Sequence, residues 1–256
     1  MASTILVRNL LWQASILLLD ASPQFNRWTD EELVRWLNEG RRVIVKYLPM
    51  ASSRVDVVKL QAGTRQYFGS IASGDIKPGD GSTAQSIKVM RLMDMIRNMG
   101  SDGLTPGRPI KIVDRTDLDT LDPDWHSRVS PRVQNFTVDP MNPKYAYVYP
   151  GVTGVMWAEV SLCEDLPDIT YTANAFLHSG SDATTIGIDD RFSDDLLNYV
   201  CARAHMKDSK YSDTGKASMF ANLFTTSLNA QITVATGTNP NLARMPFTAD
   251  TLGAAK

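Results

Sequence analysis

The sequence has only two cysteines, Cys163 and Cys201, which lie far apart and in no CxxC pair. This spacing favours neither a disulfide framework nor a zinc knuckle, and it is typical of a protein from a reducing compartment. Histidine is nearly as scarce, because His126, His178 and His205 are the only three, and they show no HExxH or HxH spacing. We interpret them as surface or core histidines rather than metal ligands, and we predict no cofactor.

The chain also has no large excess of positive or negative charge, since the net charge is −2 and the isoelectric point is about 5.9. Without a basic surface, tight charge-driven binding of nucleic acid by the monomer is excluded. The sequence has no GxSxG motif for a nucleophilic serine and no GxxxxGK[ST] motif for a phosphate, so no catalytic residue is predicted. The N-terminal apolar run is broken by Gln13 and Ser15 and is too short to span a bilayer, so no membrane contact is expected.

The first fifty residues carry the patterns of two amphipathic helices. Thr29 and Glu32 have the spacing of a capping box, which starts the second helix, and Pro49 ends it. The apolar stripe of the first helix comprises Val7, Leu10, Leu11, Ala14, Leu17 and Leu18. The stripe of the second comprises Leu33, Trp36, Leu37, Gly40, Val43, Ile44, Tyr47 and Leu48, with Arg35, Glu39, Arg42 and Lys46 facing elsewhere.

From Ser52 to about Thr172 short β-like runs alternate with Gly, Pro and Asn. Two alternating runs around Pro140 and Pro143 predict a hairpin, and "GVMWAEVSL" predicts a further strand, giving an antiparallel sheet over about 133–162. Residues 145, 147 and 149 are tyrosines that would share one face of it. The segment "IKVMRLMDMIRNMG" fits a helix and a strand equally well. Residues 70–86 form a polar, Gly-rich stretch without a packing pattern, which we interpret as a loop.

Two helices are predicted after residue 190. Ser193 is the expected cap of the first, which runs to about Ser209, and Asp213 or Thr214 caps the second. No helix pair can cover its apolar stripe alone. The predicted fold is therefore α+β, a four-helix bundle made by the N- and C-terminal helix pairs with an inserted antiparallel β-rich lobe. The expected domains are residues 1–50 with 190–235 (helical), 51–189 (β-rich), and an extended C-terminal arm, 236–256.

The stretch "DRTDLDTLDPDWH", residues 114–126, holds five aspartates and a histidine. An EF-hand is excluded because the required positions hold the wrong residues, and nothing in the spacing recruits Asp189 and Asp190 for a two-metal site. We favour a structural interpretation, in which Asp114 or Thr116 caps a short helical turn and a Pro-initiated turn seats Trp125. Leu118 and Leu121 would pack inward. No metal site is predicted.

Several segments together resemble the head-to-tail adaptor proteins of short-tailed bacteriophages. They are "WTDEELVRWLNEGRRVIVKYLP", "AGTRQ", "IRNMG", "DRTDLDTLDPDWH", "YVYPGV" and "DDLLNYVCARAHMKDSKY", and their order carries the resemblance over about residues 6–228. The resemblance implies a structural virion protein, made in the cytoplasm of the bacterial host and located at the neck or tail. Such adaptors form a ring, commonly of twelve copies, that joins the portal protein to a tail nozzle or tube protein and continues the channel for genomic double-stranded DNA. The DNA would pass without sequence-specific binding.

The resemblance also implies where contacts lie. The C-terminal arm would dock on the portal and order as it binds. The candidate subunit or portal contacts are Arg35, Glu39, Arg42, Lys46, Asn241, Arg244 and Phe247. Two alternatives remain open: a metal-dependent hydrolase built on Asp114, Asp117, Asp119, Asp122 and His126, and a tail tube or nozzle component.

Overall fold

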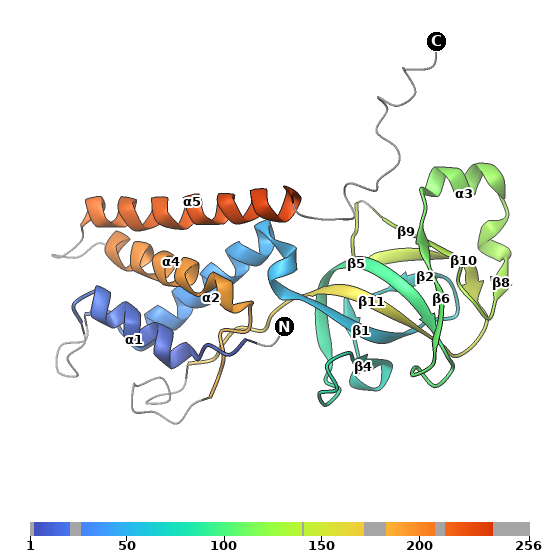
Figure 1. Ribbon diagram of the computed structural model, residues 1–256, viewed down its shortest axis with the longest axis horizontal. Helices are drawn as coiled ribbons and strands as arrows, with labels where there is room; N and C mark the ends of the chain where they lie inside the picture. The colour runs from blue at the N-terminus through green and yellow to red at the C-terminus, as the bar shows by residue number, and fades with distance from the viewer. Residues whose placement is uncertain (1–2, 21–26, 140, 172–182, 208–212, 238–256) are drawn as a thin grey trace, which may run out of the picture. The chain divides into compact units, whose positions relative to one another are not determined.

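A computed structural model describes residues 3–20, 27–139, 141–171, 183–207 and 213–237. These residues form a mixed α+β protein, which confirms the predicted class. The chain divides into two compact units, a β unit of Pro49–Pro167 and a helical unit of Ala2–Leu48 with Asp168–Lys256 (Figure 1). The described residues 168–171 and 183–189 therefore group with the helices, whereas the predicted lobe extended to residue 189. That each predicted domain folds independently stays a prediction.

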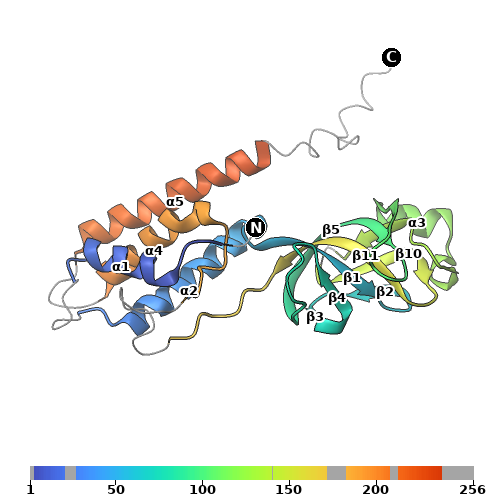
Figure 2. The same ribbon diagram turned by 60° about the horizontal axis from the view of Figure 1, so that its bottom comes forward.

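The helical unit contains four α-helices and a short 3₁₀ turn, η4 (Asp190–Phe192), among its described residues. The helices are α1 (Val7–Leu17), α2 (Asp30–Tyr47), α4 (Ser193–Met206) and α5 (Thr214–Gly237). Figure 2 shows the same unit from another side, and α4 packs against each of the other three helices. Helix α4 is therefore the element that joins the other three helices of the unit. No helix among the described residues is both long and apolar enough to cross a membrane.

The predicted starts of these helices are confirmed at two places and wrong at one. Thr29 and Glu32 form the capping box, with both hydrogen bonds at 3.3 Å. The Asp213 carboxylate accepts a hydrogen bond from the Lys216 amide at 3.0 Å at the start of α5. Ser193 does not cap α4, because η4 precedes the helix and Asp189 caps that turn through the Arg191 amide at 3.1 Å.

Most residues of the predicted apolar stripes are buried, but Trp36 and Val43, in the interior of α2, are only half-buried. Val7, Leu10, Leu11 and Ala14 of α1 are buried, as are Leu33, Leu37 and Ile44 of α2. Leu17 and Tyr47 are 47% and 57% exposed, although both were expected on the buried stripes. Each is the last residue of its helix, and the next residue, Leu18 or Leu48, takes the buried position instead.

The β unit contains eleven strands and one α-helix, α3 (Arg115–Leu121), among its described residues. The strands are β1 (Ser53–Leu60), β2 (Gly63–Tyr67), β3 (Ser70–Ile71), β4 (Ile76–Pro78), β5 (Ile87–Met99), β6 (Pro106–Pro109), β7 (Lys111–Ile112), β8 (Val129–Ser130), β9 (Asn135–Val138), β10 (Tyr145–Val152) and β11 (Met156–Glu164). Three more 3₁₀ turns are η1 (Pro49–Ser52), η2 (Ser73–Asp75) and η3 (Trp125–Ser127). Most pairings are antiparallel, while β10 with β8 and β7 with β9 are parallel.

The strands form two sheets rather than the single sheet predicted for residues 133–162. The hairpin of β9 and β10 is confirmed, and it belongs to a five-stranded sheet ordered β2-β10-β9-β7, with β8 on β10. Strand β11 instead lies in the six-stranded sheet ordered β3-β5-β11-β1-β4, with β6 on β5. Apolar side chains of both sheets share one core, which includes Phe68, Phe136 and Leu162. Because both sheets face that core, alternation along each strand looks the same and does not reveal which sheet a strand joins.

Strand β5 is the segment whose pattern fitted two periods. Its buried residues Val89, Leu92, Met95 and Asn98 recur every third position. The pairing with β11 shifts register three times, and each shift passes over one residue of β5. These bulges break the alternation of a strand and produce a helix-like spacing. Residues 70–86 also differ from the prediction, because Ile71 in β3 and Ile76 in β4 are buried in the core.

Candidate interaction surfaces

The aspartate-rich stretch 114–126 forms α3 and the turn after it. The Asp114 carboxylate accepts hydrogen bonds from the amide and the hydroxyl of Thr116, at 2.7 and 2.6 Å. These bonds hold the pKa of Asp114 below its ordinary value. Asp114 is therefore the N-cap of α3, as predicted.

Three further side chains of this stretch, those of Asp119, Asp122 and His126, have separate partners. Asp119 accepts a hydrogen bond of 2.8 Å from the indole N–H of Trp125, which is fully buried. Asp122 pairs with Arg128, and the His126 ring lies 3.2 Å from the Thr64 hydroxyl. No group of three or more His, Cys, Asp or Glu residues within the described ranges is placed to hold a metal. The geometry supports caps and turns, although Leu121, expected to pack inward, is 82% exposed at the end of α3.

Asp189 and Asp190 take no part in that stretch. Asp190 accepts hydrogen bonds from the Ser3 hydroxyl at 2.8 Å and from the Thr4 amide at 3.0 Å. Hydrogen bonds from Thr4 and Ser3 lower the pKa of Asp190 to about 2. Asp190 thus anchors the segment before α1 to the start of α4, a contact that sequence analysis missed because 187 positions separate Ser3 from its partner.

The tyrosines of β10 share one face, as predicted, and arginine guanidinium groups from other elements lie over two of their rings. The Arg65 guanidinium lies 5.9 Å from the ring centre of Tyr145, and that of Arg115 lies 5.5 Å from Tyr147. Trp125 meets the edge of Tyr147, and His126 stacks on Trp125 at 3.7 Å. Arg65 belongs to β2 and Arg115 to α3, so the sequence of β10 alone does not reveal either contact. Tyrosine, tryptophan and arginine are the residues enriched at protein interfaces.

Cys201 and His205 lie one turn apart on the buried side of α4, and their environment excludes a reactive thiolate. Burial raises the pKa of Cys201 to about 12. The His205 ring is stacked on Phe220 of α5, at 5.9 Å between ring centres, and meets Trp28 edge to face. Within the described residues, neither nitrogen of the His205 ring has a hydrogen-bond partner. Cys201 therefore packs in the core as an apolar side chain. His178 lies outside the described residues.

The four charged residues of α2 predicted to make contacts all retain exposed or half-exposed side chains. Arg42 pairs with Asp168 at 3.3 Å, and Glu39 pairs with Arg203 of α4 at 2.9 Å. Arg35 and Lys46 are exposed. Their predicted role between subunits stays a prediction. Asn241, Arg244 and Phe247 lie outside the described residues.

Two buried polar side chains in the helical unit, those of Asn38 and Asp195, belong to no sequence motif and were not predicted. Asn38 of α2 exchanges two hydrogen bonds, both 2.9 Å, with the backbone of Ile169, and it accepts one from the buried Arg41 at 3.0 Å. Asp195 is buried between α4 and α5, where it accepts a hydrogen bond of 2.6 Å from Gln231. Burial raises the pKa of Asp195. The first contact holds α2 against the segment around Ile169, and the second holds α4 against α5. The partner of each polar side chain could be identified only from the fold.

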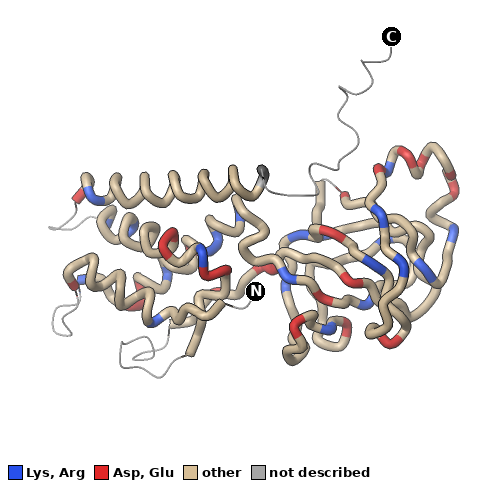
Figure 3. The backbone as a smooth tube through the Cα atoms, in the orientation of Figure 1, with Lys and Arg blue, Asp and Glu red and all other residues tan. Residues whose placement is uncertain are grey.

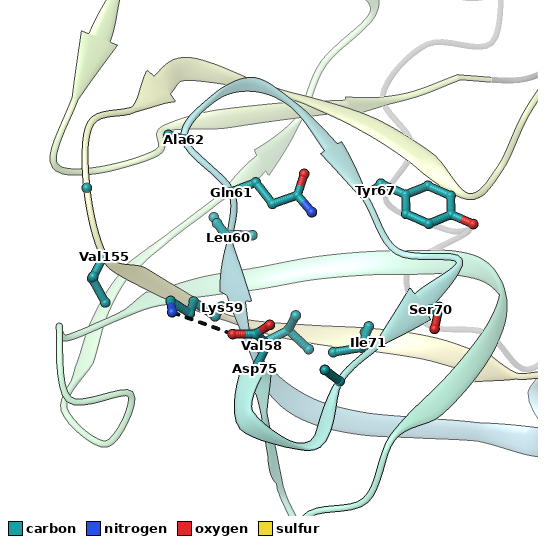
Figure 4. A pocket seen from close by; sticks show the side chains of 12 residues that line it. Val58, Lys59, Leu60, Gln61, Ala62, Tyr67, Ser70, Ile71, Asp75 and Val155 are labelled. Carbon is teal, nitrogen blue, oxygen red and sulfur yellow. Dashed lines mark ion pairs between the residues drawn. The ribbon is translucent and has the colours of Figure 1, made fainter.

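The β unit has a shallow hollow of about 490 Å³ beside the end of β1 (Figure 4). The ion pair of Lys59 and Asp75, 3.5 Å apart, lines it together with Tyr67, Ser70 and Val155. Since the charges of Lys59 and Asp75 neutralise each other, the hollow presents no net charge to a ligand.

Comparison with protein-family models matches residues 7–245 to a family described as SU10 adaptor protein. The matched range includes the β unit and all four helices of the helical unit. Comparison with curated proteins finds no similar sequence.

Proposed function

The chain belongs to the SU10 adaptor protein family, a family of bacteriophage head-to-tail adaptors, and on this premise we propose that it forms a ring joining the portal vertex to the tail. The carrying observation is the extent of the match, which includes both compact units rather than one of them. The proposed ring has about twelve copies, as in the adaptors that the sequence resembles. Its subunits would meet head to tail, which closes a ring without self-complementary faces.

Further parts of this proposal concern the subunit and its channel. We propose that α1, α2, α4 and α5 act as a four-helix bundle, supported by the packing of α4 on the other three. The ring would continue the DNA channel between portal and tail nozzle or tube protein. A net charge of −2 supports passage rather than retention of DNA, because many phosphate contacts would hold it in place. The protein would act in the virion without catalysis.

The contacts of the aspartate-rich stretch argue against the hydrolase alternative. Metal ligation by Asp114, Asp119 and Asp122 would break a helix cap, the bond to a buried indole and an ion pair, respectively. Their carboxylates each serve a different structural partner, so they do not converge on one point.

Native mass spectrometry of the purified protein, alone and mixed with its portal ring, tests the proposed function. We expect a discrete ring of about twelve copies on the portal. A monomer or dimer that is indifferent to the portal would contradict the adaptor function.

A further inference from the structure

Helix α5 lacks charge over most of its length. From Ala217 to Gly237 the sequence contains no Asp, Glu, Lys, Arg or His, and Figure 3 shows charge only at its beginning, where Lys216 lies. One side of α5 is buried through Ala217, Phe224 and Leu228. The outward side of a surface helix ordinarily carries charged residues, and this one carries none.

The outward side of α5 has an apolar strip. Met219, Leu223 and Val234 are 50%, 49% and 61% exposed, and with Ala230 they fall within about 60° of the helix circumference at 100° per residue. The strip is about 22 Å long at 1.5 Å per residue. We call Met219, Leu223, Ala230 and Val234 the α5 strip. Exposed apolar surface of this kind marks a contact site.

The exposed residues of α1 are also uncharged, while its one charged residue, Arg8, is half-buried. These exposed residues are Asn9, Gln13, Ile16 and Leu17, the last two of which are 49% and 47% exposed. The other two helices of the unit differ, because α2 exposes Arg35, Arg42 and Lys46, and α4 exposes Asp194 and Arg203. Helix α4 packs on both α1 and α5, and it lies between them in Figure 1. Each subunit therefore offers two different uncharged faces.

We propose that the α5 strip of one copy packs against the exposed face of α1 on the next copy in the ring. This inference rests on the proposed function, because a head-to-tail ring requires two different faces on every subunit. An uncharged face matches another uncharged face, whereas a charged occupant would lose its hydration without gaining an opposite charge. A strip of this length and about 10 Å in width, the diameter of a helix, is smaller than a standard interface of about 800 Å² per partner. The α5 strip alone therefore gives only weak pairing between two copies, and closure of the ring is expected to hold the copies together.

Disulfide trapping tests the contact in the full-length protein assembled on its portal ring. The native cysteines are buried and the pKa of each is raised, so they react slowly. We expect Leu223→Cys protein mixed with Ile16→Cys protein to form a linked dimer under mild oxidation, while neither variant links alone. The matched control, Asn229→Cys on the other flank of α5, should link to Ile16→Cys at least about tenfold less.

The outcomes separate this inference from the proposed function. A complete ring without the Leu223 to Ile16 link overturns the inference and leaves the ring intact. Linking of Leu223→Cys protein to itself, or to the portal protein, also overturns it, because another occupant then covers α5. If no ring forms at all, the proposed function fails first and the inference fails with it.

A charge on the strip gives a second measurement. Leu223→Glu should lower the yield of ring at least about tenfold, the scale of a hot-spot residue, whereas Asn229→Glu should leave it unchanged. Both positions are exposed, so thermal unfolding of both variants should match the parent protein. Equal ring yields for both variants would contradict the assignment.

Discussion

The Asp119 carboxylate accepts a hydrogen bond from the indole of Trp125, whose side chain has no exposed surface. Asp119→Ala should lower the free energy of unfolding by about 1 kcal/mol or more, because the buried indole N–H loses its acceptor. Asp117→Ala, at an exposed position of the same helix, should change it by less than about 0.5 kcal/mol. Urea denaturation measures both.

The same variants test the metal alternative. Millimolar Mg²⁺ or Mn²⁺ should leave the urea midpoint of the parent protein unchanged. A midpoint that rises with metal in the parent protein but not in Asp119→Ala would restore a metal site at this stretch.

His205 should make stability depend on pH. Burial lowers the pKa of His205 from its ordinary value of 6.5, so the unfolded chain binds the proton more readily than the folded one. The stability that His205 contributes is therefore full above about pH 6.5 and is lost as the pH falls below it. We expect thermal unfolding to shift downward from pH 7.5 to pH 5.5, and His205→Phe to flatten this slope. A His205→Phe variant that keeps the parental slope would contradict the assignment.

Residue roles were predictable where the partners are close in sequence. Asp114 and Thr116 are two positions apart, and the turn that seats Trp125 is local, so spacing was sufficient to predict them. The contacts of Asp190 with Ser3 and of Asn38 with Ile169 span more than a hundred positions. Only folding brings such partners together, and no local pattern records them.

At the scale of one element, the start of α2 depends on the Thr29 side chain. Thr29→Ala should lower the free energy of unfolding by about 1 kcal/mol, the usual loss for an N-cap, because the Glu32 amide loses its acceptor. Thr29→Ser keeps the hydroxyl and should retain most of the stability. Urea denaturation of the two variants measures the difference, and equal losses would show that the hydroxyl does not cap α2.

Helices were predicted more reliably than strands in this chain. Helix stripes recur every three or four residues over several turns, so α1, α2, α4 and α5 were found with small errors at their ends. Strand β5 was ambiguous because its bulges impose a period of three. Strands β3 and β4 have two and three residues, too few to show any period. Assignment of β11 to the second sheet depends on partners from β1 and β5, which the sequence of β11 does not encode.

For the whole molecule, the C-terminal arm is the proposed portal contact. A chain ending at Gly237 should unfold like the full-length protein and bind the portal ring at least about tenfold more weakly, because it lacks the predicted contact residues Asn241, Arg244 and Phe247. Native mass spectrometry with the portal ring measures binding.

A full-length variant provides the matched control for that truncation. Alanine at Asn241, Arg244 and Phe247 together should weaken portal binding in the same direction. Undiminished binding by the truncated chain would remove the arm from the proposal.

The ends of the β unit lie side by side, because Ser53 of β1 pairs with Cys163 of β11. Their Cα atoms are therefore about 5 Å apart, a gap that a turn of a few residues can close. An exchange of the coding sequence in whole codons between these two points would replace the entire insert and leave the sequences of the helices on either side of it unchanged. The β unit is thus suited to vary between related viruses independently of the helices.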